Sequence, residues 1–453
     1  MTAQSLLVPR SRLLVLTAVA LVPLLTLAGT GGVGAALAGA GAGLLVAAMI
    51  FDALRAWPRL DGLTVKVPEV IRLVKNRAAE ITVQWAHEGA AGRPLCFGLA
   101  LPPGVESEQT NYRVTVPESL TGVFAWPVTP TQRGSFRLPC VAVETESPWG
   151  WWALRRRIAS RCELRVHPDL ASGLRANARF LAQGGAGGFA QRQVGKGREF
   201  DKLRDYLPGD ASDEIHWKVT AKRRQPVTKV YQIERTQEVY VIVDASRLSS
   251  RLFPGAGPAS RPEPLLEHAL NAALVLGAVA ERQGDHFGLV TFSDQVHGFV
   301  RARTGSAHYQ ASREIIVRLQ PRLVSPDYEE LGTFLRLRLR RRALLLFLTS
   351  LEDPVAAEGF LRGVDLLRHQ HLCVVVQPRA PDVEPAFARG QAARIRRVDD
   401  LTGVLAGHLQ WQSARTLELT LRHRGVTSVT APAGELAGAL IQRYLDVKRR
   451  QVL

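Results

Sequence analysis

Cysteine is scarce in this sequence, and its few copies are not paired. Cys96, Cys140, Cys162 and Cys373 lie far apart, and no two of them form a Cys-x-x-Cys pair. A disulfide framework or a zinc knuckle requires cysteines at close, regular spacing. The pattern indicates neither, and we expect reduced, partly buried thiols.

A long stretch near the amino terminus lacks charge. No Asp, Glu, Lys or Arg occurs in Leu13–Phe51, and the run is broken at residues 29–32 by three glycines and a threonine. A membrane-spanning helix needs about 20 apolar residues, and the two arms, 13–28 and 33–51, approach that length. The second arm is rich in Gly and Ala, as closely packed membrane helices are. We therefore predict a transmembrane helical hairpin within residues 1–59.

Basic residues flank this uncharged stretch on both sides. Arg10 and Arg12 precede it, and Arg55 and Arg59 follow it. Positive charge favours the cytoplasmic side of a membrane, so we expect a two-pass protein of the cell membrane with cytoplasmic soluble domains. The alternative is a secretory signal peptide that begins with Arg10 and Arg12.

Acidic residues are fewer than basic ones. The chain has 58 Lys and Arg against 41 Asp and Glu, a net charge of +17, which favours an anionic neighbour such as membrane lipid, nucleic acid or an acidic protein. One basic stretch contains Arg336, Arg338, Arg340, Arg341 and Arg342. No aromatic-interleaved binding motif accompanies it, so we expect these arginines to lie in solvent or against lipid rather than on nucleic acid.

Residues 60–168 consist of short segments, such as Ala79–His87, that alternate apolar and polar residues between Gly and Pro. This period of two predicts strands with one buried face and hence an antiparallel β-sandwich-like domain. Near its end, Trp149, Trp151 and Trp152 precede three arginines. We expect a hairpin tip packed on the sandwich; the alternatives are a membrane interface or a stacking surface for nucleotides.

Residues 169–237 begin with a glycine-rich stretch. It does not form a phosphate-binding loop, because Lys196 is followed by Gly197 rather than Ser or Thr, and Ala190 stands where the first glycine of that motif belongs. We expect a linker here, followed by a segment dense in charged and aromatic residues.

Apolar segments of strand length alternate with helical segments from residue 238 to 453. Continuous apolar strands that alternate with helices predict a parallel sheet covered on both faces. We therefore expect a doubly wound α/β domain with a C-terminal helix. Ligands of such folds bind at the carboxyl ends of the strands, and Asp244 ends the strand predicted at 239–244.

Hydroxyl side chains follow Asp244, at Ser246, Ser249 and Ser250. Mg²⁺ prefers several oxygen ligands, commonly carboxylates with hydroxyls and water. The arrangement resembles the metal-ion-dependent adhesion site of von Willebrand factor A domains, where Asp-x-Ser-x-Ser after the first strand is joined by a distant Thr and a distant Asp. The later segment "GDHFGLVTFSD" resembles another strand of that fold.

This resemblance implies a degenerate metal site. Its possible ligands are Asp244, Ser246, Ser249 and Thr333. Leu248 replaces the second serine, Ser350 replaces the distant aspartate, and the nearest carboxylates are Glu352 and Asp353. We expect Mg²⁺ to bind weakly or not at all, and we assign no certain cofactor. The alternative is that Asp244 caps a helix or orders a turn.

The charged segment that precedes the sheet resembles the hallmark of the domain of unknown function 58 family, in which a pattern like G-x-E-F-x-x-L-R-x-Y-x-P-G-D precedes I-x-W-K and A-[KR]-R. The matching residues are Gly197, Glu199, Phe200, Leu203, Arg204, Tyr206, Pro208, Gly209, Asp210, Ile215, Trp217, Lys218, Ala221 and Arg223. The family usually carries an Arg shortly before the Ile, where this chain has Asp213 and Glu214. From the residues themselves we expect an ion-pair network above three packed aromatics, Phe200, Tyr206 and Trp217. Its members would be Glu199, Arg204, Asp205, Asp210 and Lys218.

The family resemblance implies a membrane-anchored protein with a von Willebrand factor A-like domain and no established activity. Members are often encoded beside MoxR-type AAA+ ATPases, so the resemblance implies such an ATPase as the cytoplasmic partner. We therefore predict a non-enzymatic, protein-binding adaptor in complex assembly or maturation. Two alternatives remain open: a hydrolytic enzyme that uses carboxylates near Asp210 or Asp244, and a basic nucleic-acid-binding protein.

Overall fold

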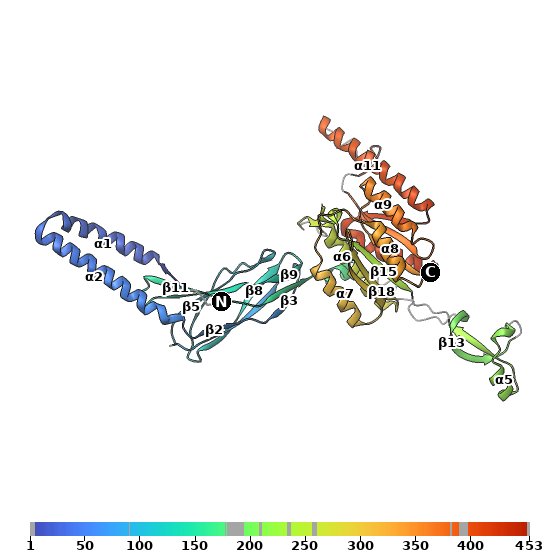
Figure 1. Cartoon of the computed structure of the whole chain (residues 1–453), viewed down its shortest axis with the longest axis horizontal. Helices are drawn as coiled ribbons and strands as arrows, with labels where there is room; N and C mark the ends of the chain where they lie inside the picture. The colour runs from blue at the N-terminus through green and yellow to red at the C-terminus, as the bar shows by residue number, and fades with distance from the viewer. Residues whose placement is uncertain are drawn as a thin grey trace. The chain divides into compact units, whose positions relative to one another are not determined.

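The computed structural model describes residues 5–89, 91–176, 178, 194–207, 211–232, 237–255, 261–380, 383–388 and 397–450. The chain divides into two compact units, Met1–Asp169 and Leu170–Leu453. Figure 1 shows the helices and strands of each unit. The first unit contains the helical hairpin and the strand-rich domain, and the second contains the α/β domain.

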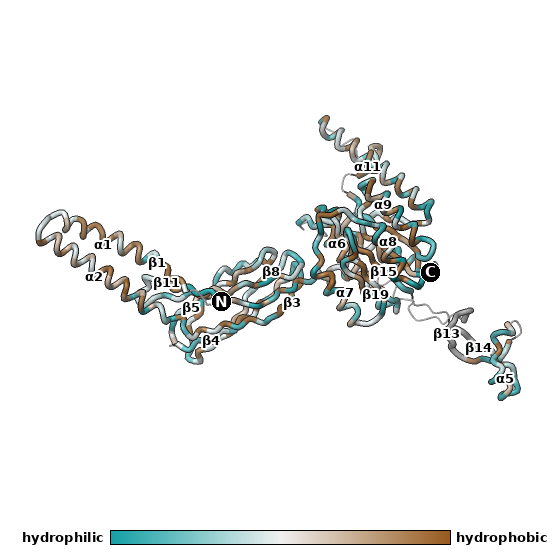
Figure 2. The backbone as a smooth tube through the Cα atoms, viewed as in Figure 1, coloured by the Kyte–Doolittle hydropathy of each residue, from teal (hydrophilic) through white to brown (hydrophobic). Residues whose placement is uncertain are grey.

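Two long apolar helices lie near the amino terminus. They are α1 (Ser11–Gly29) and α2 (Gly32–Ala56), and the 3₁₀ helix η1 (Trp57–Leu60) follows. Gly31 and Gly32 form the turn with φ of 71° and 52°, a region that glycine adopts without strain. Few of the helices' side chains are buried within the protein, and the apolar colour follows both helices in Figure 2. Both helices are long and apolar enough to cross a membrane.

Three sheets complete the first unit. The largest contains, in order, β1 (Ser5–Pro9), β11 (Trp152–Ala159), β10 (Cys140–Glu146), β5 (Pro94–Leu99) and β7 (Tyr112–Thr115). The second contains β2 (Leu63–Lys66), β4 (Ala79–His87), β8 (Thr121–Pro130) and β6 (Val105–Glu106). The third contains β3 (Val70–Val74), β12 (Glu163–His167) and β9 (Gly134–Arg137). Inward side chains of all three sheets form one apolar core, as the alternation in the sequence predicts.

Two features of these sheets differ from the expected organisation. β1 pairs with β11, so the chain contributes a strand before it enters α1, whereas the sequence predicts only the hairpin for residues 1–59. β12 and β3 pair in parallel, whereas the sequence predicts an antiparallel arrangement. A short turn can join only antiparallel strands, and β3 and β12 are separated by most of the domain.

The tryptophan-rich segment before β11 contacts the end of α2. The indole N–H of Trp152 donates to the carbonyl oxygen of Met49 at 3.0 Å. Asp52 is buried and accepts hydrogen bonds from the Ser147 hydroxyl at 2.6 Å and from the Trp149 backbone N–H at 3.1 Å. Donors within the protein thus compensate the burial of this carboxylate. The segment ties α2 to the strands, where the sequence predicts packing on the sandwich alone.

A six-stranded sheet lies at the centre of the second unit. Its strands are, in order, β19 (Val296–Arg303), β18 (His286–Phe292), β15 (Glu238–Asp244), β20 (Ala343–Leu348), β21 (Leu372–Arg379) and β22 (Thr427–Pro432). All neighbours are parallel except β18 and β19. The edge strand is antiparallel because only residues 293–295 connect it to β18, too few for a crossover.

Helices accompany this sheet. They are α3 (Leu170–Ala176), α6 (Leu265–Arg282), α7 (Ser306–Arg318), α8 (Tyr328–Arg338), α9 (Pro354–Asp365), α11 (Val398–His423) and α12 (Leu436–Arg450). Shorter elements are the 3₁₀ helices η3 (Arg247–Ser250) and η4 (Ala433–Glu435) and the two-residue strands β16 (Leu252–Phe253) and β17 (Glu263–Pro264). The sequence pattern does not predict β19 or α11.

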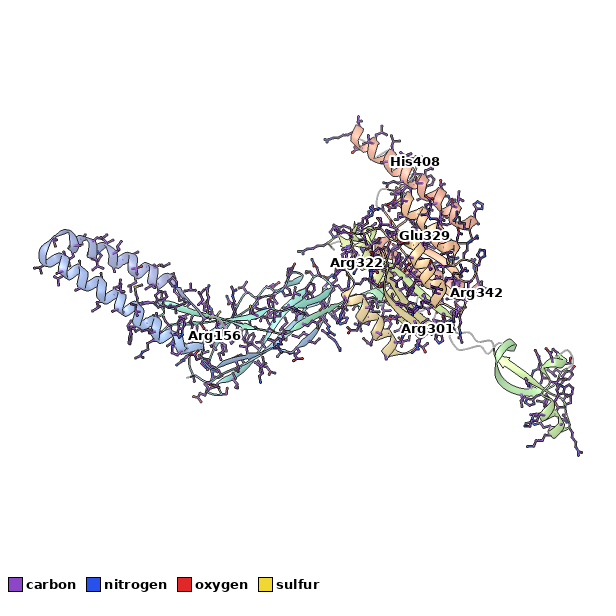
Figure 3. All side chains as sticks on the ribbon, in the orientation of Figure 1. Arg156, Arg301, Arg322, Glu329, Arg342 and His408 are labelled. Atoms are coloured by element: carbon purple, nitrogen blue, oxygen red, sulfur yellow. The ribbon has the colours of Figure 1, made fainter. Side chains whose placement is uncertain are left out.

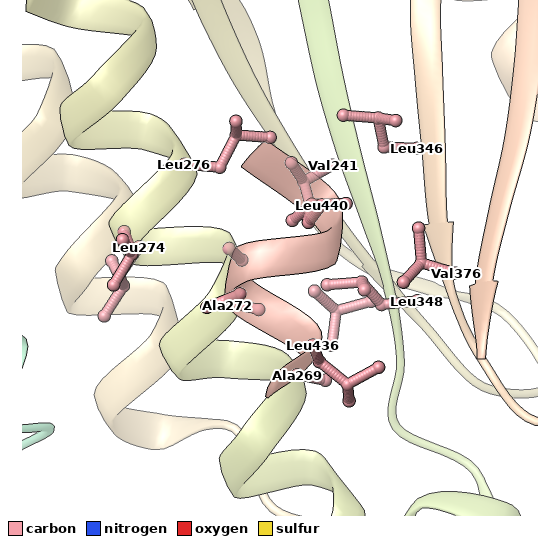
Figure 4. Close-up of a cluster of buried hydrophobic side chains, with 14 of the residues drawn as sticks. Val241, Ala269, Ala272, Leu274, Leu276, Leu346, Leu348, Val376, Leu436 and Leu440 are labelled. Atoms are coloured by element: carbon pink, nitrogen blue, oxygen red, sulfur yellow. The ribbon is translucent and has the colours of Figure 1, made fainter. Parts of the chain in front are cut away.

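Alternate side chains of β15 enter two different cores. Val239, Val241 and Val243 belong to a core shared with α6 and α12, part of which Figure 4 shows. Tyr240 and Ile242 belong to a core shared with α8 and α9. Both faces of the strand are therefore buried, which explains its unbroken apolar sequence.

His371, just before β21, makes the stability of the second unit depend on pH. Its side chain is buried, neither ring nitrogen has a hydrogen-bond partner among the described residues, and burial lowers its pKa below 6.5. The unfolded chain then binds more protons than the folded one, so the free energy of unfolding falls as the pH falls below about 6.5. We expect the melting temperature of His371→Leu to fall less than that of the wild type when the pH is lowered from 7.5 to 5.5.

The matched control is His369→Leu, because His369 is exposed two residues earlier. It is expected to retain the full pH dependence of the wild type in differential scanning calorimetry of the detergent-solubilised chain. Equal pH dependence in wild type and His371→Leu would contradict the assignment.

Candidate functional site

The candidate site lies at the carboxyl edge of the six-stranded sheet, where β15 ends at Asp244. This carboxyl group is only 2% exposed. One of its oxygens accepts the Ser246 backbone N–H at 2.8 Å, and the other accepts the Thr349 hydroxyl at 2.6 Å. Thr349 directly follows the buried strand β20, which pairs in parallel with β15. Because parallel strands end at the same edge, residues 105 positions apart meet here.

Tyr328 completes a buried chain of hydrogen bonds. Its hydroxyl lies 2.7 Å from the Thr349 hydroxyl, and since Thr349 donates to Asp244, Tyr328 is the donor to Thr349. The Tyr328 ring packs edge-on against Phe360 of α9, with 5.3 Å between the ring centroids. Packing therefore holds the tyrosine in place, and its hydroxyl positions the threonine.

The electrostatics of this cluster follow from its burial. Burial raises the pKa of Asp244 above its ordinary value, and the hydrogen bonds from Thr349 and Ser246 oppose that rise. The pKa of Tyr328 is raised well above 10, first by burial and second by the negative charge of Asp244. Tyr328 is therefore a neutral hydrogen-bond donor at physiological pH.

The serines after Asp244 bind the backbone of their own turn. Ser246 precedes η3 and accepts the Leu248 N–H at 3.4 Å, and the Ser249 hydroxyl donates to the Ser246 carbonyl at 2.7 Å. Both serines are buried. Together with the bond from Asp244 to the Ser246 N–H, this is an ordered turn that ends a strand, the alternative to a metal site that the sequence leaves open.

Thr333, the fourth predicted ligand, does not lie at this site. It is exposed on α8, whereas Tyr328, Leu331, Gly332 and Leu335 form the buried face of that helix. The sequence alone does not show where α8 begins. Asp327 caps it by accepting the N–H groups of Glu329 and Glu330, which places Tyr328 toward Asp244. Sequence reasoning missed both Tyr328 and Thr349.

The two nearest carboxylates named from the sequence are paired with arginines. The Arg247 guanidinium binds Asp353 at 2.8 Å and donates to the Ser325 hydroxyl at 3.3 Å. Arg251 binds Glu352. Asp353 also caps α9 by accepting the Val355 N–H at 3.0 Å. These ion pairs join the loop after β15 to the loop after β20.

The residues around Asp244 do not fit a hard divalent cation as they are arranged. Such a cation needs several free oxygen ligands around it. Asp244 is the single carboxylate of the cluster, both its oxygens are engaged, and the nearby acids bind arginines. No group of three or more His, Cys, Asp or Glu side chains suited to a metal occurs in the described part of the chain.

A serine, a histidine and an aspartate meet beside this edge, after β18. The Ser293 hydroxyl donates to Asp294 at 2.6 Å and lies 2.6 Å from Nε2 of His297. In a hydrolytic triad the acid orients the histidine through its other ring nitrogen. Here Asp294 binds the serine and is 3.8 Å from the same Nε2. Ser293 is fully buried, so this group lacks the geometry of an activated nucleophile. This group is not among the sites predicted from the sequence.

The hallmark segment forms a two-stranded sheet. β13 (Val194–Asp205) pairs with β14 (Val227–Gln232), and η2 (Ser212–Glu214) and the short helix α5 (Trp217–Arg223) lie between them. Arg204 pairs in register with Thr228. The predicted packing of Trp217 is wrong, because this side chain is 68% exposed.

The other hallmark residues divide into two groups. Leu203 and Tyr206 are half-buried, whereas Lys218 and Arg223 are exposed on α5. Gly197, Glu199 and Phe200 lie in β13, but their side chains are outside the described part, as are Pro208, Gly209 and Asp210 entirely. The predicted ion-pair network of Glu199, Arg204, Asp205, Asp210 and Lys218 therefore stays a prediction.

Comparison with known proteins gives matches to uncharacterised proteins. The chain is 27% identical over 193 residues to the uncharacterized protein Mb1516 of Mycobacterium bovis and, equally, to the uncharacterized protein Rv1480 of Mycobacterium tuberculosis. Each match covers 42% of this chain and 58% of the relative.

Among solved structures, the VWA domain of SpRpn10 matches with a TM-score of 0.27 at 9% identity, over 46% of this chain and 95% of that one. An uncharacterized membrane spanning protein from Vibrio fischeri matches with a TM-score of 0.19 at 17% identity, over 47% of this chain and 98% of that one.

Residues 202–384 match the sequence profile described as "Protein of unknown function DUF58". This region runs from β13 of the hallmark segment through β21 of the six-stranded sheet. It therefore includes the carboxyl edge at Asp244 and every residue of its hydrogen-bonded cluster. Residues 202–384 of this chain are thus similar to the DUF58 family of proteins of unknown function.

Proposed function

We propose that this chain is a membrane-anchored adaptor that binds a cytoplasmic protein through the carboxyl edge of its six-stranded sheet, without a metal. The observation that carries the proposal is that Asp244, Thr349 and Tyr328 bind groups of the chain itself, while the nearby loops expose apolar side chains. Such a surface is suited to binding another protein rather than to catalysis. α1 and α2 supply the anchor.

The binding surface consists of three loops around the Asp244 cluster, and we call it the carboxyl-edge surface. Leu252, Leu323 and Val355 are 65%, 86% and 77% exposed there. The Arg247–Asp353 and Arg251–Glu352 pairs lie on the same loops. Apolar residues beside partly exposed charges are typical of protein interfaces. The arginine pairs also cross-link the loops, so the surface is preorganised and little ordering entropy is lost on binding.

The proposed partner is a MoxR-type AAA+ ATPase that takes part in complex assembly or maturation. The family resemblance of the hallmark segment supports this choice, and so does the orientation that the arginines around the hairpin favour. Both membrane helices would then start or end in the cytoplasm, where ATP is available, and the strand-rich domain and the second unit would face it.

The test measures binding of a purified MoxR-type ATPase from the same organism to the full chain in lipid nanodiscs. We expect binding with ATP and Mg²⁺, loss of at least 10-fold in affinity in Leu323→Asp/Val355→Asp, and no loss in Leu337→Asp. Leu337 is the matched control because it is 76% exposed at the other end of α8.

A second arm of the same experiment tests whether a metal is needed for binding. An ATPase prepared with bound nucleotide and then measured in EDTA is expected to keep its affinity, because the Asp244 cluster holds no metal ligand set. No binding to the wild type, or equal binding by Leu323→Asp/Val355→Asp, would refute the adaptor proposal.

Neither alternative function has comparable support in the described residues. The Ser293 group lacks triad geometry, and Asp210 lies outside the description. Arg336 and Arg338 occupy the last turn of α8, where positive charge favours the helix dipole. Arg338 lies over the Phe334 ring at 5.3 Å, and Arg342, labelled in Figure 3, lies in the exposed loop before β20. These local roles account for the arginines without nucleic acid.

A further inference from the structure

The strand-rich domain meets the helical hairpin at an exposed cluster of aromatic and basic side chains. Phe51 and Trp149 are 49% and 48% exposed, and their ring centroids lie 5.8 Å apart. Trp151 continues the cluster, with its ring centroid 5.0 Å from that of Trp149, and Arg55 lies over the Phe51 ring at 5.1 Å. We call these residues, together with Arg12, the collar. Such aromatic and basic residues are typical of the headgroup level of a membrane.

Arg12 lies on a turn that other contacts hold in place. The backbone N–H of Trp149 donates to the buried Asp52 at 3.1 Å. The next residue, Gly150, has a φ of 72°, and a Cβ added to it would lie 3.1 Å from Nη1 of Arg12. Glycine is therefore the residue that leaves room for the guanidinium group at this position.

Arg12 and Arg55 have no ion-pair partner among the residues that the structure describes. Arg10, one residue before α1, pairs with Glu146 instead. Asp52 is buried and accepts hydrogen bonds from the tryptophan segment. Both acids beside the collar are thus engaged. A cation at the edge of the hydrocarbon gains more from an anionic partner than it does in water, because the dielectric constant there is lower.

An apolar groove begins at Arg12 and follows α1 into the apolar part of the hairpin, which Figure 2 colours as hydrophobic. Its volume is about 610 Å³. From Arg12 to Pro23 the helix rises about 16 Å at 1.5 Å per residue, and one leaflet of a hydrocarbon core about 30 Å thick measures about 15 Å. Between these two ends the groove is lined by Val15, Leu16, Val19 and Ala20.

We propose that the collar and this groove bind one anionic phospholipid, with its phosphate on Arg12 and one acyl chain in the groove. The order of the groups along α1 points to this ligand, since a cation and tryptophans at the headgroup level are followed by an apolar groove one leaflet long. A guanidinium donates well-directed hydrogen bonds to a phosphate. In a zwitterionic lipid the ammonium group offsets the phosphate charge, so an acidic lipid is favoured.

This proposal rests on the membrane anchor of the proposed function, but on neither the ATPase nor the carboxyl-edge surface. The first experiment measures lipid bound to the detergent-solubilised full chain by native mass spectrometry, in titrations with phosphatidylglycerol and with phosphatidylcholine. We expect one phosphatidylglycerol per chain, and binding of phosphatidylcholine that is weaker by about 5-fold or more.

Substitutions of Arg12 test the headgroup contact. Arg12→Gln should lose the preference for phosphatidylglycerol, whereas Arg12→Lys should keep it, because an ammonium group also binds phosphate. The matched control is Arg157→Gln, since Arg157 is exposed on β11 farther from the collar, and it should bind both lipids as the wild type does. Arg12→Gln is also expected to keep the wild-type melting temperature, because Arg12 has no ion pair to lose among the described residues. A preference that survives in Arg12→Gln would overturn the assignment.

The second experiment tests the groove with two alanines of α1. Ala20→Phe fills the groove and should weaken phosphatidylglycerol binding by about 5-fold or more, because the acyl chain loses its contacts. Ala18→Phe is the control, because Ala18 is exposed about 160° around the helix from Ala20. Soluble glycerol phosphate should not displace the lipid. Displacement by it would mean that the site binds phosphate alone, which would refute the lipid assignment.

The outcomes also separate this proposal from the proposed function. A wild type that needs detergent but binds both lipids equally would overturn the phospholipid site and leave the anchor intact. A chain that stays in solution without detergent would refute the anchor itself, and with it both proposals. Binding of the ATPase in phosphatidylcholine nanodiscs tests the adaptor without the acidic lipid.

Discussion

Replacing Asp244 by Ala is expected to lower the free energy of unfolding of the second unit by about 3 kcal/mol, whereas Asp244→Asn is expected to cost less than about 1 kcal/mol. Alanine leaves the Ser246 N–H and the Thr349 hydroxyl without an acceptor in a buried site. Asparagine keeps an acceptor for the Ser246 N–H and can donate its amide hydrogen to Thr349, while Tyr328 accepts from Thr349.

Asp244→Asn removes a charge as well as changing hydrogen bonds, so it also changes how stability depends on pH. Because burial raises the folded-state pKa of Asp244, the folded chain binds more protons than the unfolded one above the ordinary value of 3.8. Its contribution to stability therefore falls as the pH rises through that value toward the folded pKa. Asn carries no charge, so Asp244→Asn should lose this pH dependence and gain stability relative to the wild type as the pH rises.

Hydrogen exchange of β15 and β20 peptides in a urea series, on the full chain in detergent, measures these differences. A metal bound at Asp244 would change the relative stabilities of the wild type and the two variants. Mg²⁺ would then protect the wild type, and Asp244→Asn would lose that protection as completely as Asp244→Ala. Stabilisation of the wild type by millimolar Mg²⁺, absent in both variants, would refute the metal-free cluster.

Gly363→Ala is the second change with a large expected effect, about 3 kcal/mol or more of destabilisation. α8 and α9 cross in backbone contact: an added Cβ at Gly363 would lie 2.1 Å from the carbonyl oxygen of Tyr328, and one at Gly332 would lie 2.6 Å from that of Gly363. Overpacking usually costs about 1–3 kcal/mol when side chains can adjust. Here the neighbour is backbone, so the helices must separate.

Gly359→Ala, one turn earlier in α9, is the matched control. Its Cβ would meet only the Tyr328 ring, at 3.8 Å, so the higher helix propensity of alanine should stabilise the chain by about 0.5–1 kcal/mol. Because separation of the helices moves Tyr328, Gly363→Ala should also release the hydroxyl of Thr349 and raise hydrogen exchange at the end of β20. Wild-type stability in Gly363→Ala would show that the crossing is looser than the structure indicates.

Some parts of the fold are readable from local patterns. The boundaries of β4, β15, α6 and β20 follow closely from alternation or from unbroken apolar runs, because in these segments burial is determined by the residues' own periodicity. Local periodicity does not predict β1, β19 or α11. β1 is a strand only because β11 offers a free edge, and α11 has an apolar line that its own domain does not bury.

The residues of the candidate site also differ in whether the sequence predicts them. Asp244 and Ser246 follow a recognisable strand, so their place at the carboxyl edge is predictable. Tyr328 and Thr349 lie 84 and 105 residues after Asp244 in the chain, as the differences 328 minus 244 and 349 minus 244 give. The sequence predicts Thr333 instead, because the register of α8 depends on the Asp327 cap and on the close contact at Gly363.

By itself, then, the sequence determines the apolar hairpin, the alternation of strands and helices after residue 238, the hallmark segment and the position of Asp244, because each is a pattern of neighbouring residues. Only the tertiary structure decides what surrounds that carboxylate. Parallel pairing of β15 with β20 brings in Thr349, the α8–α9 crossing brings in Tyr328, and Arg247 and Arg251 engage the nearby acids. These are contacts between distant segments, and packing rather than local preference selects them.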